Sequence, residues 1–272
     1  MDWIWSLYDL DTCTCAKAIK SGYKVISFGL KNVEHYGKKN INNVIACRER
    51  ESMKAGAIYE VNINLADFYT AVKILEKYPK PKYLVASPPC ESWVNSNSAH
   101  KANYTNEKGL NLHWRNKWNP FDFTVRWKAK RLNGVNCAIT TAKIINHFKP
   151  EFWAIENPKS SLIFDYLAEN MEFYGYRNLC NYFSYGFSVL KNTIICSNAK
   201  LHLKCDQPGY MLNEVSRGGN KARNAKRRNN EYKDFEFLSN KTRSLVPVGL
   251  YEDIIGQFEK GGQKTLFPLG VI

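Results

Sequence analysis

Long hydrophobic runs are missing from this sequence, and cysteines are few. No apolar stretch approaches the roughly 20 residues that a membrane helix requires, so we expect no membrane partner. The opening segment MDWIWSLYDLDTC is acidic where a secretory signal is basic, which predicts a protein that stays in the cytoplasm. Eight cysteines in 272 residues are too sparse for a disulfide scaffold, so we expect reduced thiols.

Acidic residues are also scarce, with 25 Asp and Glu against 39 Lys and Arg and a net charge of +14. An excess of basic residues on a folded domain attracts polyanions, above all nucleic acid. A Lys- and Asn-rich composition can also make a chain basic without any functional consequence. Here, however, eight Lys and Arg lie between 101 and 131, and six lie within residues 217–228. This clustering favours a nucleic-acid partner.

What the sequence does contain is a regular alternation of strand-like and helix-like segments. Apolar, β-rich segments predict strands at 3–10, 23–30, 57–63, 82–87, 151–157, 178–186 and 192–198. Helical spacing predicts helices at 15–25, 67–78, 134–148 and 161–171. This rhythm predicts an α/β fold, an open and mostly parallel sheet with helices on both faces.

Polar or reactive residues follow three of the predicted strands. The segment DLDTCTC follows the first strand, SPPC follows the fourth and ENP follows the fifth. Ligands of open α/β sheets bind outside the carboxyl ends of the strands, so these segments are the expected site.

Cys90 and Glu156 are the candidates for chemistry. The φ-restricted Pro88 and Pro89 fix the backbone before Cys90, at a loop mouth where nearby cations lower a thiol pKa and favour the thiolate. Glu156 also ends an apolar strand and is soon followed by a proline. A thiol and a carboxylate at two strand ends suit nucleophilic addition to a ring, with the acid supplying a proton. A cysteine alone is more often structural, so the hypothesis depends on the pair.

The motifs SPPCESW (87–93) and AIENP (154–158) resemble the catalytic motifs of the cytosine-5 DNA methyltransferases, in the phage-type branch of that family. Three further segments are similar to that branch and follow in the same order: SYGFSVLKNTIICSN at 184–198, SRGG at 216–219 and TRSLVPVGLYEDII at 242–255. The resemblance covers most of residues 80–255. It implies a Rossmann-like methyltransferase fold and a bacterial or phage-infected host cell.

By this resemblance, Cys90 would add to carbon 6 of a cytosine flipped out of duplex DNA, and Glu156 would donate a proton to ring nitrogen 3. Carbon 5 would then accept a methyl or related group from S-adenosylmethionine. Lys191 matches an arginine of many relatives that helps to hold the base. The expected DNA contacts lie in the segment after Cys90 and in a basic arm: Trp93, Trp114, Arg115, Arg217, Lys221, Arg223, Arg227 and Arg228.

The donor side of the motif set departs from the family. This chain reads Asp-Leu-Asp-Thr-Cys at 9–13, where relatives read Phe-Ser-Gly-Thr-Gly and use glycine for close backbone approach. The positions expected at the cofactor are Asp11, Thr12, Cys13, Gly29, Asn62, Pro88 and Ser244. Three alternatives follow: an altered cofactor pose, a different donor, or a protein that binds DNA without methylating it. An RNA substrate is a fourth.

The motif positions predict the domain organisation. We expect a catalytic domain over 1–183, with a long DNA-contacting loop at 91–133, and a small basic target-recognition-like region over 184–240. Residues 241–272 would return to the catalytic domain. Cys196, His202 and Cys205 lack the paired spacing of a structural zinc site, so we predict no metal. We also expect a monomer.

Overall fold

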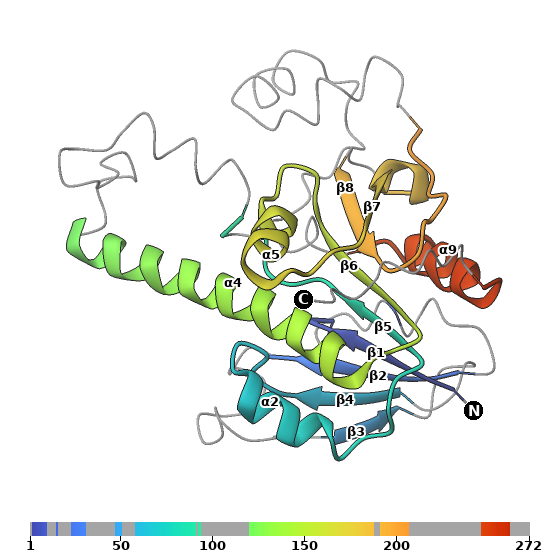
Figure 1. Ribbon diagram of the computed structural model, residues 1–272, viewed down its shortest axis with the longest axis horizontal. Coiled ribbons are helices and arrows are strands. Elements are labelled where there is room, and N and C mark those ends of the chain that lie inside the picture. The colour runs from blue at the N-terminus through green and yellow to red at the C-terminus, as the bar shows by residue number, and fades with distance from the viewer. Residues whose placement is uncertain are drawn as a thin grey trace, which may run out of the picture.

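A computed structural model describes residues 2–9, 15, 23–30, 47–50, 58–90, 92–93, 120–187, 191–206 and 246–261. These residues form one eight-stranded sheet in the order β3-β4-β2-β1-β5-β6-β8-β7 (Figure 1). The strands are β1 (Asp2–Leu7), β2 (Tyr23–Gly29), β3 (Cys47–Arg50), β4 (Ile58–Asn62), β5 (Tyr83–Ala86), β6 (Phe152–Pro158), β7 (Tyr176–Asn181) and β8 (Asn192–Ser197).

Strand direction places the expected site. β4, β2, β1, β5 and β6 run parallel, whereas β3 is antiparallel at one edge and β8 is antiparallel between β6 and β7. From β1 the chain adds β2 and β4 on one side, and it then returns to add β5 and β6 on the other side of β1. The strand order thus reverses between β1 and β5, and α/β sheets bind ligands at the carboxyl ends of the strands at such a point. This strand order is that of an open, mostly parallel α/β sheet, as predicted. β3 was not predicted, because its sequence CRER has no apolar pattern.

Helices cover both faces of the sheet, which confirms the predicted fold class. On one face lie α2 (Phe68–Leu75), α4 (Pro120–Phe148) and α5 (Ile163–Met171), with α4 between the other two (Figure 1). On the other face lies α9 (Val248–Glu259). Side chains alternate along each strand, so that Trp5 packs under the first set of helices and Ile4 packs against α9.

The start of α4 corrects one prediction. The helix was expected to begin at 134, after a loop over 91–133, but it begins at Pro120 and spans 29 residues. Proline is favoured in the first turn of a helix, where its missing N–H is not needed. Residues 120–133 are therefore helical, and residues 94–119 lie outside the described residues.

The predicted domain boundary at 184 also needs correction. β8 pairs with β6 and with β7, so residues up to 206 belong to the sheet unit rather than to a separate region. The basic arm lies outside the described residues, between 207 and 245. Among the helices that the structure describes, none combines the length and the apolar character needed to cross a membrane.

Candidate active site

Two hydrogen bonds join the Pro-Pro-Cys segment to the Glu-Asn-Pro segment. The Ser87 hydroxyl donates to Oε2 of Glu156 at 2.6 Å. The Asn157 side chain donates from Nδ2 to the Pro88 carbonyl at 2.9 Å. Cys90 lies three residues beyond Ser87. The structure therefore brings the predicted nucleophile segment and the predicted acid to the same edge of the sheet.

The parallel pairing of β5 with β6 explains this proximity. Ala86, the last residue of β5, lies opposite Ile155 of β6. The residue that follows Ala86 therefore lies beside the residue that follows Ile155. Those next residues are Ser87 and Glu156. Two separate buried strands therefore deliver a hydroxyl and a carboxylate to one position.

The turn after Cys90 is tied to the helical layer. The Cys90 carbonyl accepts from the Trp93 amide at 2.9 Å, and the Trp93 carbonyl accepts from the Leu162 amide at 3.1 Å. Trp93 is only 5% exposed, and its ring centroid lies 5.0 Å from that of Tyr166. This packing corrects the prediction that Trp93 contacts DNA: the side chain is in the core.

Glu156 is 5% exposed, and both of its carboxylate oxygens have partners. Besides Ser87 on Oε2, the Tyr182 hydroxyl donates to Oε1 at 2.7 Å. The Lys191 ammonium lies 3.5 Å from the same Oε1 and 4.3 Å from the centre of the Tyr182 ring. Lys191, the third predicted catalytic residue, is thus next to Glu156.

The β7–β8 hairpin brings Tyr182 and Lys191 together. The two strands pair as far as Asn181 opposite Asn192, and the Tyr182 amide then donates to the Lys191 carbonyl at 3.1 Å. β8 in turn pairs with β6, with Ile195 opposite Glu156. The β7–β8 pair therefore carries both side chains to the carboxylate, with Tyr182 just after β7 and Lys191 just before β8.

Burial keeps the neighbouring tyrosines neutral. Burial and then the Glu156 charge raise the pKa of Tyr182 well above its usual value, so the phenol keeps its proton at neutral pH. Burial also raises the pKa of Tyr251 on α9, with further contributions from Asp9, Cys15 and Glu156. Tyr251 is therefore close enough to sense the charges at both the β1 end and the β6 end.

Asp9 links the end of β1 to Cys15. This side chain is 6% exposed and accepts from the Ser6 hydroxyl and from the Cys15 amide, both at 3.0 Å. The preceding Tyr8 has a left-handed φ of 67°, a conformation that costs roughly 1–2 kcal/mol in a residue with a Cβ. Its hydroxyl donates to the Cys137 carbonyl of α4 at 2.9 Å, which anchors the strand end.

The remaining cofactor predictions fall partly outside the described residues. Gly29 is buried at the end of β2, opposite Asn62 at the end of β4, and its carbonyl accepts from the Ile63 amide at 2.7 Å. Pro88 is buried. The predicted site residues that lie outside the described part are Asp11, Thr12, Cys13, Ser244, Trp114, Arg115, Arg217, Lys221, Arg223, Arg227 and Arg228.

Sequence reasoning missed three residues of this site. Ser87 and Asn157 each adjoin a recognised residue, so their place in the SPPC and ENP motifs was an available signal. No sequence signal indicated Tyr182, because its position depends on the pairing of β8 with β6. It lies in a segment, 178–186, that was predicted only as a strand.

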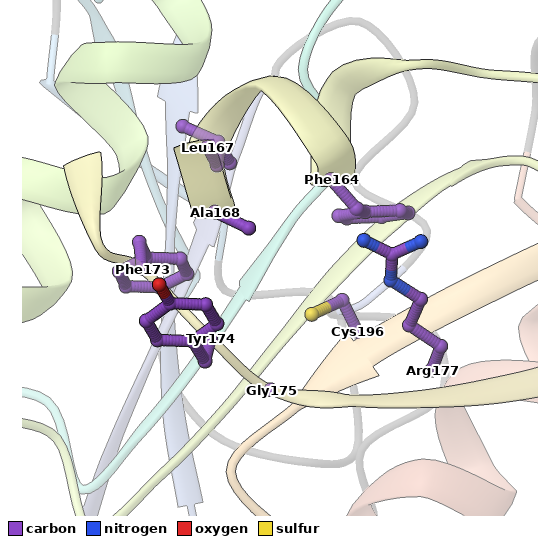
Figure 2. Close-up of a pocket in the computed structure, with 8 residues that line it drawn as sticks. All are labelled: Phe164, Leu167, Ala168, Phe173, Tyr174, Gly175, Arg177 and Cys196. Carbon is purple, nitrogen blue, oxygen red and sulfur yellow. The ribbon is translucent and has the colours of Figure 1, made fainter. Parts of the chain in front are cut away.

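A small pocket lies on the opposite face of the sheet from Glu156, under α5 (Figure 2). Burial raises the pKa of its Cys196 thiol to about 12, and Arg177 beside it forms an ion pair with Asp165 at 2.7 Å. These groups are engaged in packing rather than presented to a ligand. Within the described ranges, no group of three His, Cys, Asp or Glu could bind a metal ion.

No protein-family model matches this chain, and neither does any curated protein. Forty-nine chains of solved structures match its fold. One is a candidate DNA modification methyltransferase encoded within an Escherichia coli prophage, with a TM-score of 0.37 and 10% sequence identity. The match covers 72% of this chain, which spans less than half (46%) of that chain.

Proposed function

We propose that this chain modifies carbon 5 of cytosine in DNA, with Cys90 as the nucleophile and Glu156 as the acid. The observation that carries the proposal is the 2.6 Å hydrogen bond between Ser87 and Glu156. It joins the strand end that leads to Cys90 to a nearly buried carboxylate. Lys191 adds a cation at 3.5 Å from that carboxylate.

These groups suit addition to a pyrimidine ring. The Cys90 thiolate forms a bond to carbon 6. The π electrons of the carbon 5–carbon 6 bond then form a carbon 4–carbon 5 double bond, and those of the carbon 4–nitrogen 3 bond move to nitrogen 3, which takes a proton from Glu156. Carbon 5 is then nucleophilic. After carbon 5 takes up an electrophile, its hydrogen leaves as a proton to water and the thiolate departs from carbon 6 as the carbon 5–carbon 6 double bond forms again. Nitrogen 3 returns its proton to Glu156, and the aromatic ring is restored.

The proposed substrate is a base taken out of duplex DNA. An enzyme cannot reach carbon 6 of a stacked base, and flipping the nucleotide out costs about a few kcal/mol. The net charge of +14 supports a polyanionic partner, and the basic clusters at 101–131 and 217–228 are the proposed phosphate contacts. We propose that the chain acts as a monomer in the cytoplasm of a bacterium or a phage-infected cell.

S-adenosylmethionine is the donor that the resemblance implies, but the described residues do not fit it as the family binds it. At the end of β2, Gly29 and Leu30 supply no carboxylate for ribose hydroxyls. Asp9, in the turn where the donor would approach, is turned inward onto Ser6 and Cys15. This favours a second candidate function: the same chemistry with a different donor, or DNA binding without group transfer.

The test is designed to be independent of the donor. Addition of a thiolate to carbon 6 lets carbon 5 exchange its hydrogen with water, so genomic DNA labelled with tritium at carbon 5 of cytosine should release tritium without any donor. We expect release by the wild-type chain and none by Cys90→Ser, whereas Cys205→Ser, a half-buried thiol outside the proposed site, should release at the wild-type rate. Equal release by Cys90→Ser would contradict the assignment.

Two further arms separate the alternatives. RNA labelled in the same way replaces DNA in parallel reactions, and faster release from RNA would assign an RNA substrate. Calorimetric titration with S-adenosylmethionine and S-adenosylhomocysteine then examines the donor. Micromolar binding supports methyl transfer, whereas tritium release without binding supports another donor. DNA binding without tritium release and without S-adenosylmethionine binding supports a protein that binds DNA but transfers no group.

A further inference from the structure

We infer that Tyr182 is a positioning residue that leaves the transferable proton of Glu156 on Oε2, the oxygen that faces the Cys90 strand end. This inference rests on the proposed function and adds to it which oxygen delivers the proton. It depends on the different partners of the two carboxylate oxygens.

Oε1 is surrounded by donors. The Tyr182 hydroxyl approaches it at 2.7 Å, and the Lys191 ammonium, which has three N–H donors and no acceptor, lies 3.5 Å away. A proton on Oε1 would face both of these donors and lose a hydrogen bond. The buried phenol keeps its own proton, because its pKa is raised by burial and by the carboxylate. Oε1 is therefore the oxygen that accepts.

Oε2 has a partner of a different kind. The Ser87 hydroxyl can donate to a carboxylate or accept from a carboxylic acid by rotating its O–H bond. At 2.6 Å the contact has the length typical of a hydroxyl bonded to an ionised carboxylate. When Glu156 is protonated, Oε2–H can donate to Ser87 or to a base placed beside it. The acidic proton is thus directed to the β5 side.

Tyr182 is well suited to fix this arrangement. The residue is fully buried, and its ring centroid lies 5.7 Å from that of Phe187 in an edge-on contact. The same ring lies under the Lys191 ammonium at 4.3 Å. A rigid ring therefore sets the direction of the hydroxyl and the place of the lysine together.

The test is the pH dependence of tritium release by Tyr182→Phe. Among the described residues, groups that can titrate or carry charge and that interact with Glu156 include Lys191, Tyr182, Tyr251 and Cys180. The substitution removes one oxygen and keeps the ring over Lys191. Without the donor on Oε1 the proton is no longer held on Oε2, so the pH profile of the rate should change in shape and not only in height. The maximal rate should drop by about tenfold, because a loosened acid is misplaced.

Ser87 variants examine the other oxygen. Ser87→Ala should lower the maximal rate by about tenfold or more, and Ser87→Thr, which keeps a hydroxyl, should restore most of it. A Tyr182→Phe profile that differs from wild type only by a constant factor would mean a structural role and would overturn the inference. So would a wild-type rate in Ser87→Ala.

The design separates this inference from the proposed function. If wild type releases tritium and Cys90→Ser does not, the proposed function stands whatever the Tyr182 profile shows. If wild type releases none from DNA or RNA, with or without S-adenosylhomocysteine, both are overturned. Circular dichroism of each variant at the assay temperature ensures that folded proteins are compared.

Discussion

Two nearly buried carboxylates at the same edge of the sheet are used in different ways. Asp9, after β1, accepts from Ser6 and Cys15, which lie three and six residues away in the chain. Glu156, in β6, is bonded by Ser87 and Tyr182, which lie 69 and 26 residues away, and it adjoins a lysine cation. These two partners of Asp9 are near it in the chain, whereas the partners of Glu156 come from distant segments.

The difference is a guide to function. A local acceptor such as Asp9 satisfies backbone and hydroxyl donors that the turn itself would otherwise leave unpaired. Glu156 has a hydroxyl donor on each carboxylate oxygen and a cation next to one of them. These partners come from distant segments, so they do not serve to stabilise a local turn. Holding such a group in place is what general acid chemistry requires. The partners of Glu156 are therefore the reason for proposing it as the catalytic carboxylate.

The largest expected effect comes from Glu156→Gln. The amide cannot give up a proton as a carboxylic acid does, so we expect tritium release to fall on the order of 10²- to 10³-fold. Glu169→Gln on the exposed side of α5 is the matched control and should leave the rate unchanged. If both variants release tritium equally, Glu156 is structural like Asp9, and the contrast disappears.

The next effect is on stability and comes from Asp9→Ala. The Ser6 hydroxyl and the Cys15 amide lose their acceptor in a buried site, which should lower the free energy of unfolding by about 2–4 kcal/mol in urea titrations. Asp67→Ala, which removes the exposed cap of α2, should cost only about 1 kcal/mol. A variant that stays stable yet loses tritium release would place Asp9 in the chemistry.

The smallest effect is expected from Tyr251→Phe, at high pH. Burial raises the pKa of Tyr251 in the folded protein above the usual value near 10. Above that pH the unfolded chain binds fewer protons than the folded chain, so stability is present below pH 10 and is lost as pH rises. Removing the phenol should flatten this loss by up to about 1.4 kcal/mol per pH unit. Urea titrations between pH 8 and 11 measure it.

Tyr69→Phe is the control for this pH series, because Tyr69 is 72% exposed. Its stability should fall with pH as steeply as that of wild type. If Tyr251→Phe also follows wild type, burial does not raise the pKa of Tyr251.

The sequence predicted those parts of the molecule that depend on local pattern. The apolar run LVA before Pro-Pro-Cys predicted β5, and FWAIEN predicted β6, so Cys90 and Glu156 were expected at strand ends. The place of Tyr182 was not predictable, because it requires β8 to insert beside β6. Trp93 was misinterpreted, because an aromatic residue beside a basic segment is equally suited to stacking on bases and to filling a core.

The position of α9 has a consequence for how the chain folds during synthesis. Residues 248–259 pack against β1, and Phe258 stacks on Phe152 with centroids 4.9 Å apart. The part of the sheet that α9 covers therefore stays exposed until α9 has left the ribosome, long after the strands beneath it. Such late closure slows folding and leaves an apolar surface open to aggregation. Chaperone dependence in cells is thus an expected property of this fold.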